Sequence, residues 1–263
     1  MSAPLDGHRA RRRFGQNFLT DSQVIRDILT SVAPTAEDHI LEIGPGLGAL
    51  TRPLLHTPAR LTVVEIDRDL GARLAREFGA EPRFRLVQAD VLTVRFDALA
   101  EPAGKLRLVG NLPYNITTPL LLHALDQLDV LQDLHVMVQR EVALRLAAAP
   151  GNADYGRLGI ACQACCEVEC LLDVPPESFE PAPSVFSSVV RLRPRPLRPT
   201  PVEMRRLAAV TQTAFSQRRK MVRQTLGKLF AADLLAALDI PLTARAEEIP
   251  VATYVALAAA APT

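Results

Sequence analysis

The sequence predicts an α/β protein in which a parallel sheet is covered by helices and followed by a small all-helical domain. Three observations predict this fold. Short apolar runs alternate with segments of helical periodicity between residues 39 and 148, as in parallel sheets with both faces covered. The first run ends in a glycine-rich loop, Gly44-Pro45-Gly46-Leu47-Gly48. From residue 201 onward the sequence is rich in Ala, Leu, Arg and Glu, which is typical of helices.

The individual elements follow in chain order. Apolar residues at near-helical spacing predict a first helix within residues 14–33, with Asp21 as its N-cap. Apolar runs bounded by turn residues predict the strands of the sheet, and the amphipathic stretches between them predict its helices. The strands are expected at 39–43, 61–66, 84–87, 106–109 and 134–138, and the helices at 69–78, 119–128 and 139–148.

The regular alternation of strands and helices stops after residue 148. Residues 160–170 and 187–192 are expected to be two strands without an intervening helix, which indicates an antiparallel pair at one edge of the sheet. In residues 193–199, every second position or so is proline; this removes hydrogen-bond donors and predicts a linker. We therefore expect a basic, flexible arm at 1–13, a larger α/β domain at 14–195 and a small helical domain at 196–263.

Four cysteines lie within nine residues: Cys162, Cys165, Cys166 and Cys170. On a strand, Cys165 would face away from the other three, so four thiolates would not converge on one ion. Structural zinc sites also favour two separated ligand pairs. We expect no metal site and interpret the cysteines as buried free thiols.

Composition excludes several classes of protein. The chain has 263 residues, 48% of them hydrophobic and 22% charged, which is enough for a well-packed core. No apolar run approaches the roughly 20 residues of a membrane span. The N-terminus is polar and then basic, unlike a signal peptide. We expect a cytoplasmic protein.

The net charge is only +1, but it is unevenly distributed. Residues 1–20 contain four Arg and one Asp, and residues 191–228 contain eleven Lys and Arg against one acid, Glu203. The rest of the chain is consequently acidic. Two basic zones on an acidic body predict binding of a polyanion such as RNA.

The glycine loop and two acids indicate a nucleoside-containing cofactor. Glycines let the backbone pass close to a ligand. Glu65 ends the second strand, where an acid can accept both ribose hydroxyls. Asp90 ends the third, where it can accept from an exocyclic amine such as adenine N6. These residues do not distinguish S-adenosylmethionine from NAD, although the spacing Gly-x-Gly-x-Gly disfavours a nicotinamide cofactor.

The stretch Asn111-Leu112-Pro113-Tyr114 follows the fourth strand. The amide oxygen of Asn111 and the carbonyl of Leu112 could accept both hydrogens of an –NH2 group, while Tyr114 offers a face for a flat base. This arrangement suits an aromatic amine as a nucleophile toward an electrophilic methyl group. Positioning then supplies most of the rate, and no strong base is needed.

Six motifs in order and spacing resemble the ribosomal RNA adenine dimethyltransferases, and within them the bacterial small-subunit type. The resemblance covers nearly the whole chain. It is carried by residues 12–19 (RRFGQNFL), 42–51 (EIGPGLGALT), 110–115 (GNLPYN), 155–158 (YGRL), 179–185 (FEPAPSV) and 215–220 (FSQRRK).

The resemblance implies a class I (Rossmann-like) methyltransferase fold with a helical C-terminal domain and S-adenosylmethionine as cofactor. It implies dimethylation of the N6 amines of two adjacent adenosines in the 3′-terminal hairpin of small-subunit rRNA, linked to late subunit assembly. The partner would be the small subunit and its rRNA, and we expect a monomer. No membrane contact is expected.

Site residues follow by matching position. Asn111, Leu112, Tyr114 and Phe179 should surround the target adenine, with Phe179 as a second stacking face and Asn111 bridging to the cofactor. The cofactor-binding residues would be Asn17, Leu19, Gly44, Gly46, Glu65, Ile66, Asp90, Val91 and Asn111. The RNA-binding residues would be Arg157, Arg218, Arg219, Lys220 and Arg223, the last four on a helix.

Phe186 departs from the family pattern, which has a small or acidic residue after Val185. Three alternatives stay open at this point. One is the large-subunit adenine methyltransferase of macrolide resistance, which shares the cofactor residues. A second is a non-catalytic RNA-binding assembly factor, and a third is a nicotinamide oxidoreductase.

Overall fold

The computed structural model describes residues 16–101, 104–217 and 219–261. The chain divides into two compact units, one of residues 1–143 and 169–193 and the other of 144–168 and 194–263. The division at residues 193 and 194 lies close to the expected boundary at 195, whereas residues 144–168, expected in the first domain, pack with the C-terminal helices. The expected basic arm at 1–13 lies outside the described residues.

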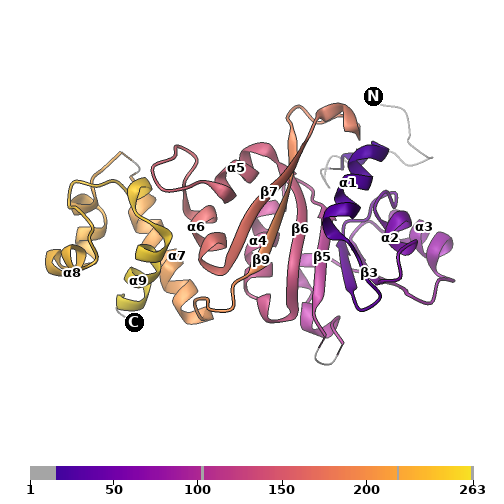
Figure 1. Ribbon diagram of the computed structural model, residues 1–263, viewed down its shortest axis with the longest axis horizontal. Helices are drawn as coiled ribbons and strands as arrows, with labels where there is room; N and C mark the ends of the chain where they lie inside the picture. Colours follow the sequence, from indigo (N-terminus) through magenta and orange to yellow (C-terminus); the bar gives the residue numbers. More distant parts are fainter. Residues whose placement is uncertain (1–15, 102–103, 218, 262–263) are drawn as a thin grey trace. The chain divides into compact units, whose positions relative to one another are not determined.

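The first unit is built on a seven-stranded sheet in the order β4-β3-β2-β5-β6-β9-β7 (Figure 1). Strands β2 to β6 pair in parallel, and β9 is antiparallel to β6. The strand order reverses between β2 and β5, the place where ligands bind in open α/β sheets. The strands are β2 (His39–Ile43), β3 (Arg60–Glu65), β4 (Phe84–Gln88), β5 (Leu106–Asn111), β6 (Leu131–Gln139), β7 (Cys166–Val174) and β9 (Ser187–Pro194).

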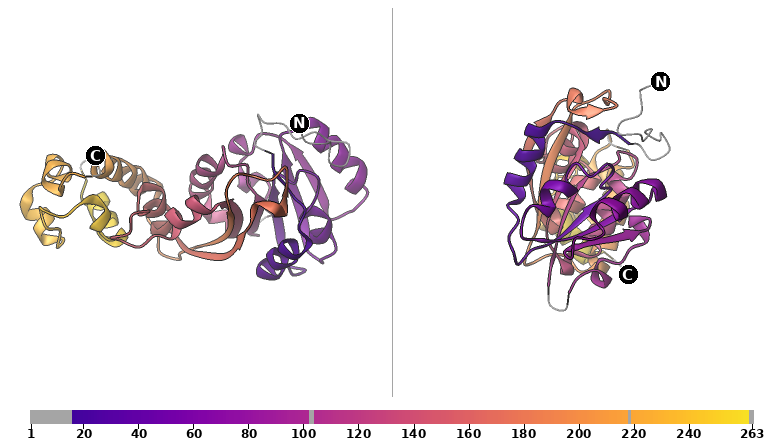
Figure 2. Two further views of the ribbon diagram at one scale, coloured as in Figure 1. Left: turned by 90° about the horizontal axis from the view of Figure 1, so that it is seen from above. Right: turned by 90° about the vertical axis from the view of Figure 1, so that its right-hand side faces the viewer.

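Helices lie on both sides of this sheet, as the two views in Figure 2 show. Asp21 caps α1 by accepting from the backbone N–H groups of Gln23 and Val24, which confirms the predicted N-cap. Apolar residues of α1 and α2 pack with β2 and β3 in one core cluster. The helices are α1 (Ser22–Val32), α2 (Thr51–Leu55), α3 (Arg68–Phe78), α4 (Thr117–Leu125) and α5 (Arg140–Ala147).

The expected cysteine strand is wrong in its first half. Residues up to Cys165 form helix α6 (Arg157–Cys165), and the strand begins only at Cys166. A short apolar run does not distinguish a strand from a buried helix, which explains the error. Burial raises the pKa of the Cys166 thiol to about 12. In the described ranges, no group of three or more His, Cys, Asp or Glu side chains is placed to hold a metal ion.

Strand β9 continues through Arg193 and Pro194, two residues into the stretch predicted as a linker. A proline at the end of a strand costs little because few ladder bonds follow it. The linker is accordingly shorter than expected.

The second unit contains α6 together with α7 (Pro201–Phe215), α8 (Ala232–Ala237) and α9 (Val251–Ala260), joined by 3-10 turns. Two buried tyrosines organise its core. The Tyr155 hydroxyl donates to the Ile249 carbonyl and the Tyr254 hydroxyl to the Ala246 carbonyl, both at 2.8 Å. No helix in the described part of the chain is long and apolar enough to cross a membrane.

A buried ionic cluster joins three neighbouring strands of the first unit. Arg107 of β5 contacts Asp133 of β6 at 2.7 Å and Asp38, just before β2, at 3.0 Å. All three side chains are about nine-tenths buried. Because one guanidinium is paired with both buried carboxylates, the cluster fixes how β2, β5 and β6 align at the end opposite to the glycine loop.

We expect Arg107→Ala to lower the free energy of unfolding by about 3–5 kcal/mol, because it leaves two buried carboxylates without their cation. Urea unfolding at neutral pH measures this loss. Arg85→Ala, at an exposed position on β4, serves as the control and should change stability by about 0.5 kcal/mol or less. Equal losses in the two variants would contradict the proposed role of the cluster.

Candidate active site

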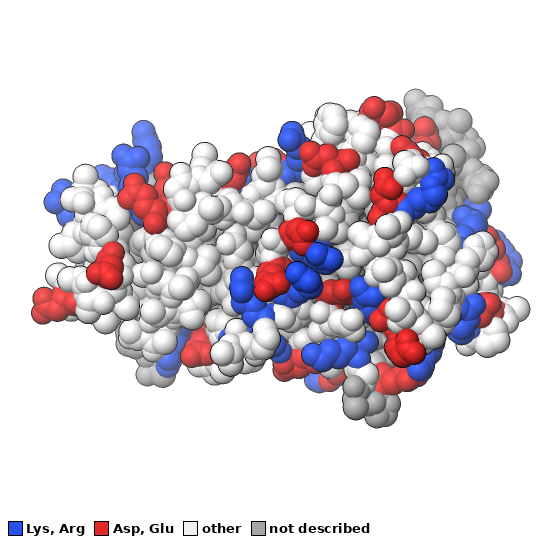
Figure 3. Space-filling model, viewed as in Figure 1, with Lys and Arg blue, Asp and Glu red and all other residues white. Residues whose placement is uncertain are grey.

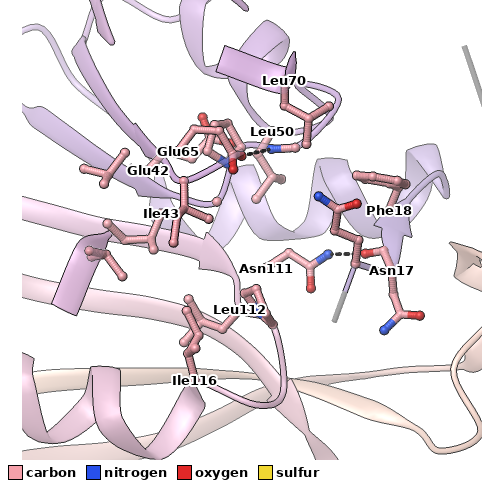
Figure 4. A pocket seen from close by; sticks show the side chains of 18 of the residues that line it. Asn17, Phe18, Glu42, Ile43, Leu50, Glu65, Leu70, Asn111, Leu112 and Ile116 are labelled. Carbon is pink, nitrogen blue, oxygen red and sulfur yellow. Dashed lines mark hydrogen bonds between the residues drawn. The ribbon is translucent and has the colours of Figure 1, made fainter. Parts of the chain in front are cut away.

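A cavity of about 300 Å³ lies at the carboxyl ends of the first strands (Figure 4). This volume is at the lower end of the range of roughly 300–1,000 Å³ found for small-molecule sites. Most of the sequence-predicted site residues line it. They are Asn17, Leu19, Gly44, Gly46, Glu65, Ile66, Asp90, Val91, Asn111, Leu112 and Tyr114.

The glycine loop after β2 requires its glycines. Gly44 and Gly46 have φ values of +64° and +58°, which side chains rarely tolerate. A Cβ atom on Gly46 would also lie only 3.1 Å from the Phe18 ring. The loop therefore passes close beneath Phe18, and this contact closes one side of the cavity.

Glu65 stands at the end of β3 with both carboxylate oxygens in use. Oε2 accepts from the Gly46 N–H at 3.2 Å and Oε1 from the Asp67 N–H at 2.8 Å. Burial raises the pKa of Glu65, while these hydrogen bonds oppose the rise. The carboxylate is thus held rigidly against the glycine loop, where ribose hydroxyls are expected.

Glu42 also lines the cavity, although it was not among the predicted site residues. It is 1% exposed, lines the cavity from β2 and accepts from the Thr51 hydroxyl at 2.7 Å. Burial raises the pKa of Glu42 to about 8. An acid inside an otherwise apolar strand was the signal that could have identified it.

The residues that follow β4 and β3 provide one carboxylate and two apolar side chains to the cavity. Asp90 is exposed, and its Oδ1 accepts from the Leu92 N–H at 3.0 Å. Val91 is buried beside it, whereas Ile66 after β3 is 47% exposed although it lines the cavity. A carboxylate between apolar side chains suits the amine edge of a purine.

A short strand covers the cavity. β1 (Phe18–Leu19) pairs antiparallel with β8 (Phe179–Glu180). Phe18 packs with Leu47 and Leu70, while Leu19 and Asn17 line the cavity. Gln16 and Phe18 also line the cavity. They were not predicted, although they belong to the same sequence motif as Asn17 and Leu19.

Phe179 is the exception among the predicted residues. It is 3% exposed, pairs with Leu19 and belongs to the core cluster of α1 and α2. It is not among the residues that line the cavity. In this arrangement the ring packs in the core and is not exposed to the cavity.

Asn111, at the end of β5, has a fixed amide. Its Nδ2 donates to the Asn17 carbonyl at 2.9 Å. Because a carbonyl can only accept, the amide oxygen must face the other way, as Figure 4 shows. Within the described residues, neither this oxygen nor the Leu112 carbonyl accepts a hydrogen bond. The site thus presents two free acceptors next to each other.

The Tyr114 ring is held from its hydroxyl end. The hydroxyl lies 2.8 Å from Ser187 Oγ at the start of β9, and the side chain is half-buried and lines the cavity. Burial raises the pKa of Tyr114, so the phenol stays neutral. A neutral, anchored ring beside two acceptors offers a stacking surface for a base.

The predicted RNA-binding residues lie in the second unit. Arg157, Arg219, Lys220 and Arg223 are exposed, while Arg218 lies outside the described residues. The expected helix through them is wrong: α7 ends at Phe215, and Arg223 lies in a 3-10 turn. Acidic side chains are interspersed with basic ones on the face drawn in Figure 3.

Comparisons with known proteins identify relatives of this chain. The sequence matches the family model described as ribosomal RNA adenine dimethylase over residues 7–261. The ribosomal RNA small subunit methyltransferase A of Bordetella petrii is 52% identical over 95% of this chain and 94% of its own. The protein of that name from Erwinia tasmaniensis is 49% identical over 96% of this chain and 93% of its own.

Two solved structures are similar over most of their length. A dimethyladenosine transferase from Plasmodium falciparum has a TM-score of 0.76 at 22% identity and covers 91% of this chain and 95% of its own, which shows a common fold. The 23S rRNA methyltransferase ErmE has a TM-score of 0.71 at 25% identity and covers 92% of this chain and 98% of its own.

We expect Glu42→Gln to change how stability depends on pH. The folded carboxyl has a pKa of about 8, against roughly 4.3 in the unfolded chain. Between these values the folded protein binds a proton that the unfolded chain does not, so its free energy of unfolding falls with rising pH, by up to about 1.4 kcal/mol per unit. Glutamine keeps the acceptor for Thr51 and does not titrate.

The variant should therefore gain stability relative to the wild type from pH 5 to pH 8, as measured by urea unfolding at each pH without added ligand. A stability difference that stays constant over this range would show that the Glu42 carboxyl titrates normally.

Proposed function

The chain belongs to the ribosomal RNA adenine dimethylase family, and from that premise we propose a specific reaction. The protein dimethylates the N6 amines of two adjacent adenosines in the 3′-terminal hairpin of small-subunit rRNA. S-adenosylmethionine is the methyl donor. The observation that carries this proposal is the pair of free acceptors at the end of β5.

The two acceptors solve the main difficulty of the reaction. The lone pair of adenine N6 is delocalised into the ring, which makes it a poor nucleophile. When Asn111 Oδ1 and the Leu112 carbonyl each accept one N6 hydrogen, the nitrogen is held in place and its lone pair can turn out of the ring plane. The Nδ2 contact to Asn17 keeps the Asn111 oxygen pointed at the amine. Such positioning can lower the activation barrier by up to roughly 7–11 kcal/mol.

No strong base is required. The attacking nitrogen forms its bond to the methyl carbon and becomes cationic, and only then gives up a proton to water. The lining of the cavity agrees with this, since its described residues include no histidine and no cysteine. In the second transfer, N6-methyladenosine has one hydrogen left, so one acceptor suffices and the other position must leave space for a methyl group.

The cavity fits the donor. Bound there, S-adenosylmethionine would supply an electrophilic methyl group on a sulfonium. Glu65 would hold the ribose hydroxyls, Asp90 would accept from the adenine amine, and Ile66 and Val91 would contact the adenine faces. The glycine loop, which approaches without side chains, would run along the methionine part.

Tyr114 would stack on the target adenine after this base has left its helix. The anchored hydroxyl fixes the ring, so the stacking geometry does not depend on the RNA. Phe179 has no part in this proposal, because its ring is in the core.

The small subunit is the favoured target. Relatives named for the small-subunit rRNA share about half of their residues with this chain, whereas the 23S enzyme shares 25%. We propose action in the cytoplasm, as a monomer, at a late stage of subunit assembly. A purely non-catalytic assembly factor is disfavoured because it would not need an oriented amide at Asn111.

We expect Asn111→Ala to reduce methyl transfer roughly 10²–10³-fold, the usual loss for one preorganised hydrogen-bonding group. The assay follows labelled methyl groups from S-adenosylmethionine to undermethylated small subunits, with large subunits in parallel. Dimethyladenosine in the small-subunit RNA, lost in the variant, supports the proposal. Label in large-subunit RNA, or wild-type binding of small subunits without any label, would contradict it.

We expect Lys220→Ala and Arg223→Ala each to weaken RNA binding and to flatten its salt dependence. Every lost phosphate contact should reduce the slope of log K against log salt by about 0.7–0.9. Titrations at several salt concentrations measure the slope. Arg76→Ala, at an exposed position on α3, is the control; an equal change there would show that the effect reflects total charge and not a local site.

A further inference from the structure

Two consecutive apolar side chains are exposed immediately before β9. Val185 is 42% exposed and Phe186 is 49% exposed. Single exposed apolar residues are common and need no explanation. Phe186 leaves about half of its side chain exposed next to a second exposed apolar residue, one position before the serine that contacts Tyr114, and the reaction described above gives it no role.

The backbone of Phe186 is fixed. Its carbonyl accepts from the Arg140 N–H at 2.9 Å, directly beyond the pairing of Gln139 with Ser187. The ladder between β6 and β9 is therefore extended to Phe186, and the ring stands on a rigid strand end. A side chain presented in this way loses little backbone entropy when it binds a partner.

Phe186 is also next to the anchor of Tyr114. The following residue, Ser187, is fully buried and contacts the Tyr114 hydroxyl at 2.8 Å. Consecutive side chains of an extended backbone point in opposite directions. Phe186 therefore does not share a base with Tyr114. It lies at the same edge of the sheet as Asn111, because Asn111 pairs with Met137 of β6 and Gln139, two residues further along β6, pairs with Ser187.

We propose that Phe186 is a stacking platform for an unpaired RNA base that flanks the methylated adenosine. The inference rests on the proposed function and extends it by a residue that binds the RNA next to the target base. When the target base leaves its helix, its neighbours lose stacking partners, and an exposed aromatic ring replaces them without reading their identity. The side chain of Val185 enlarges the apolar surface.

An RNA base fits this surface better than a protein partner. Arg140, whose backbone holds Phe186, is 53% exposed and pairs with Asp173, which is 52% exposed, at 3.1 Å. An exposed arginine whose backbone is bonded to that of an exposed phenylalanine, at the sheet edge that carries the candidate site, supplies the two kinds of group that bind single-stranded RNA. The apolar pair is too small for a stable protein interface by itself.

The first test is kinetic. Phe186→Ala should raise KM for undermethylated small subunits roughly tenfold, the loss of about one base stack. The Kd for S-adenosylmethionine and kcat at saturating subunits should stay within about twofold of the wild type, and Phe186→Trp should retain the wild-type KM. Leu122→Ala, which removes an equally exposed apolar side chain (45%) from α4, is the matched control.

The second test locates the partner. A photoreactive p-benzoylphenylalanine in place of Phe186 should crosslink to rRNA within a few nucleotides of the methylated adenosines, as mapped by primer extension. The same probe in place of Leu122 should not. Crosslinks from position 186 to a ribosomal protein, or an Ala variant with wild-type KM, would overturn the inference.

The two proposals fail in different ways. If the wild-type protein transfers no methyl group to small subunits, the proposed function fails. If it does transfer methyl groups while Phe186→Ala behaves like the wild type, only the role of Phe186 fails. If Phe186→Trp is as impaired as Phe186→Ala, the role of an aromatic face is overturned.

Discussion

The close approach of β5 to β2 is the constraint on which the candidate site depends. A Cβ atom on Gly110 would lie 2.8 Å from the Ile43 carbonyl, so only glycine permits these two strand ends to pack at this distance. The contact places Asn111 and Leu112 directly beside the glycine loop. The proposed methyl donor, next to the end of β2, and the proposed target amine, at the end of β5, can therefore be held by two strand ends that are fixed against each other.

The segment over the cavity contributes to the same geometry. The Asn17 carbonyl orients the Asn111 amide, and β1 is in turn held by its pairing with β8. The segment that covers the cavity thus also sets the direction of the Asn111 amide, the group that we propose to accept from the target amine. The position of the segment over the cavity and the orientation of the Asn111 amide therefore depend on each other.

The electrostatics of the pocket match a sulfonium donor. Glu42 and Glu65 are both buried at its wall, and burial raises the pKa of each. A protonated Glu42 beside a hydrogen-bonded Glu65 gives a moderately negative site. Because the positive charge of a sulfonium is dispersed as the methyl group leaves, a strongly negative site would stabilise the ground state more than the transition state.

Local patterns in the sequence were enough to predict most strands and helices and many of the residues that line the cavity. Periods of two and 3.6 residues are local properties, and the glycines, Glu65, Asp90 and Asn111 could be assigned because parallel strands bring their carboxyl ends together. Tertiary structure decided the rest. The Asn17–Asn111 contact joins residues 94 positions apart, and no local pattern encodes it. The helix before Cys166 and the burial of Phe179 also depend on packing, since apolar residues carry the same signal whether they face a core, a sheet or a ligand.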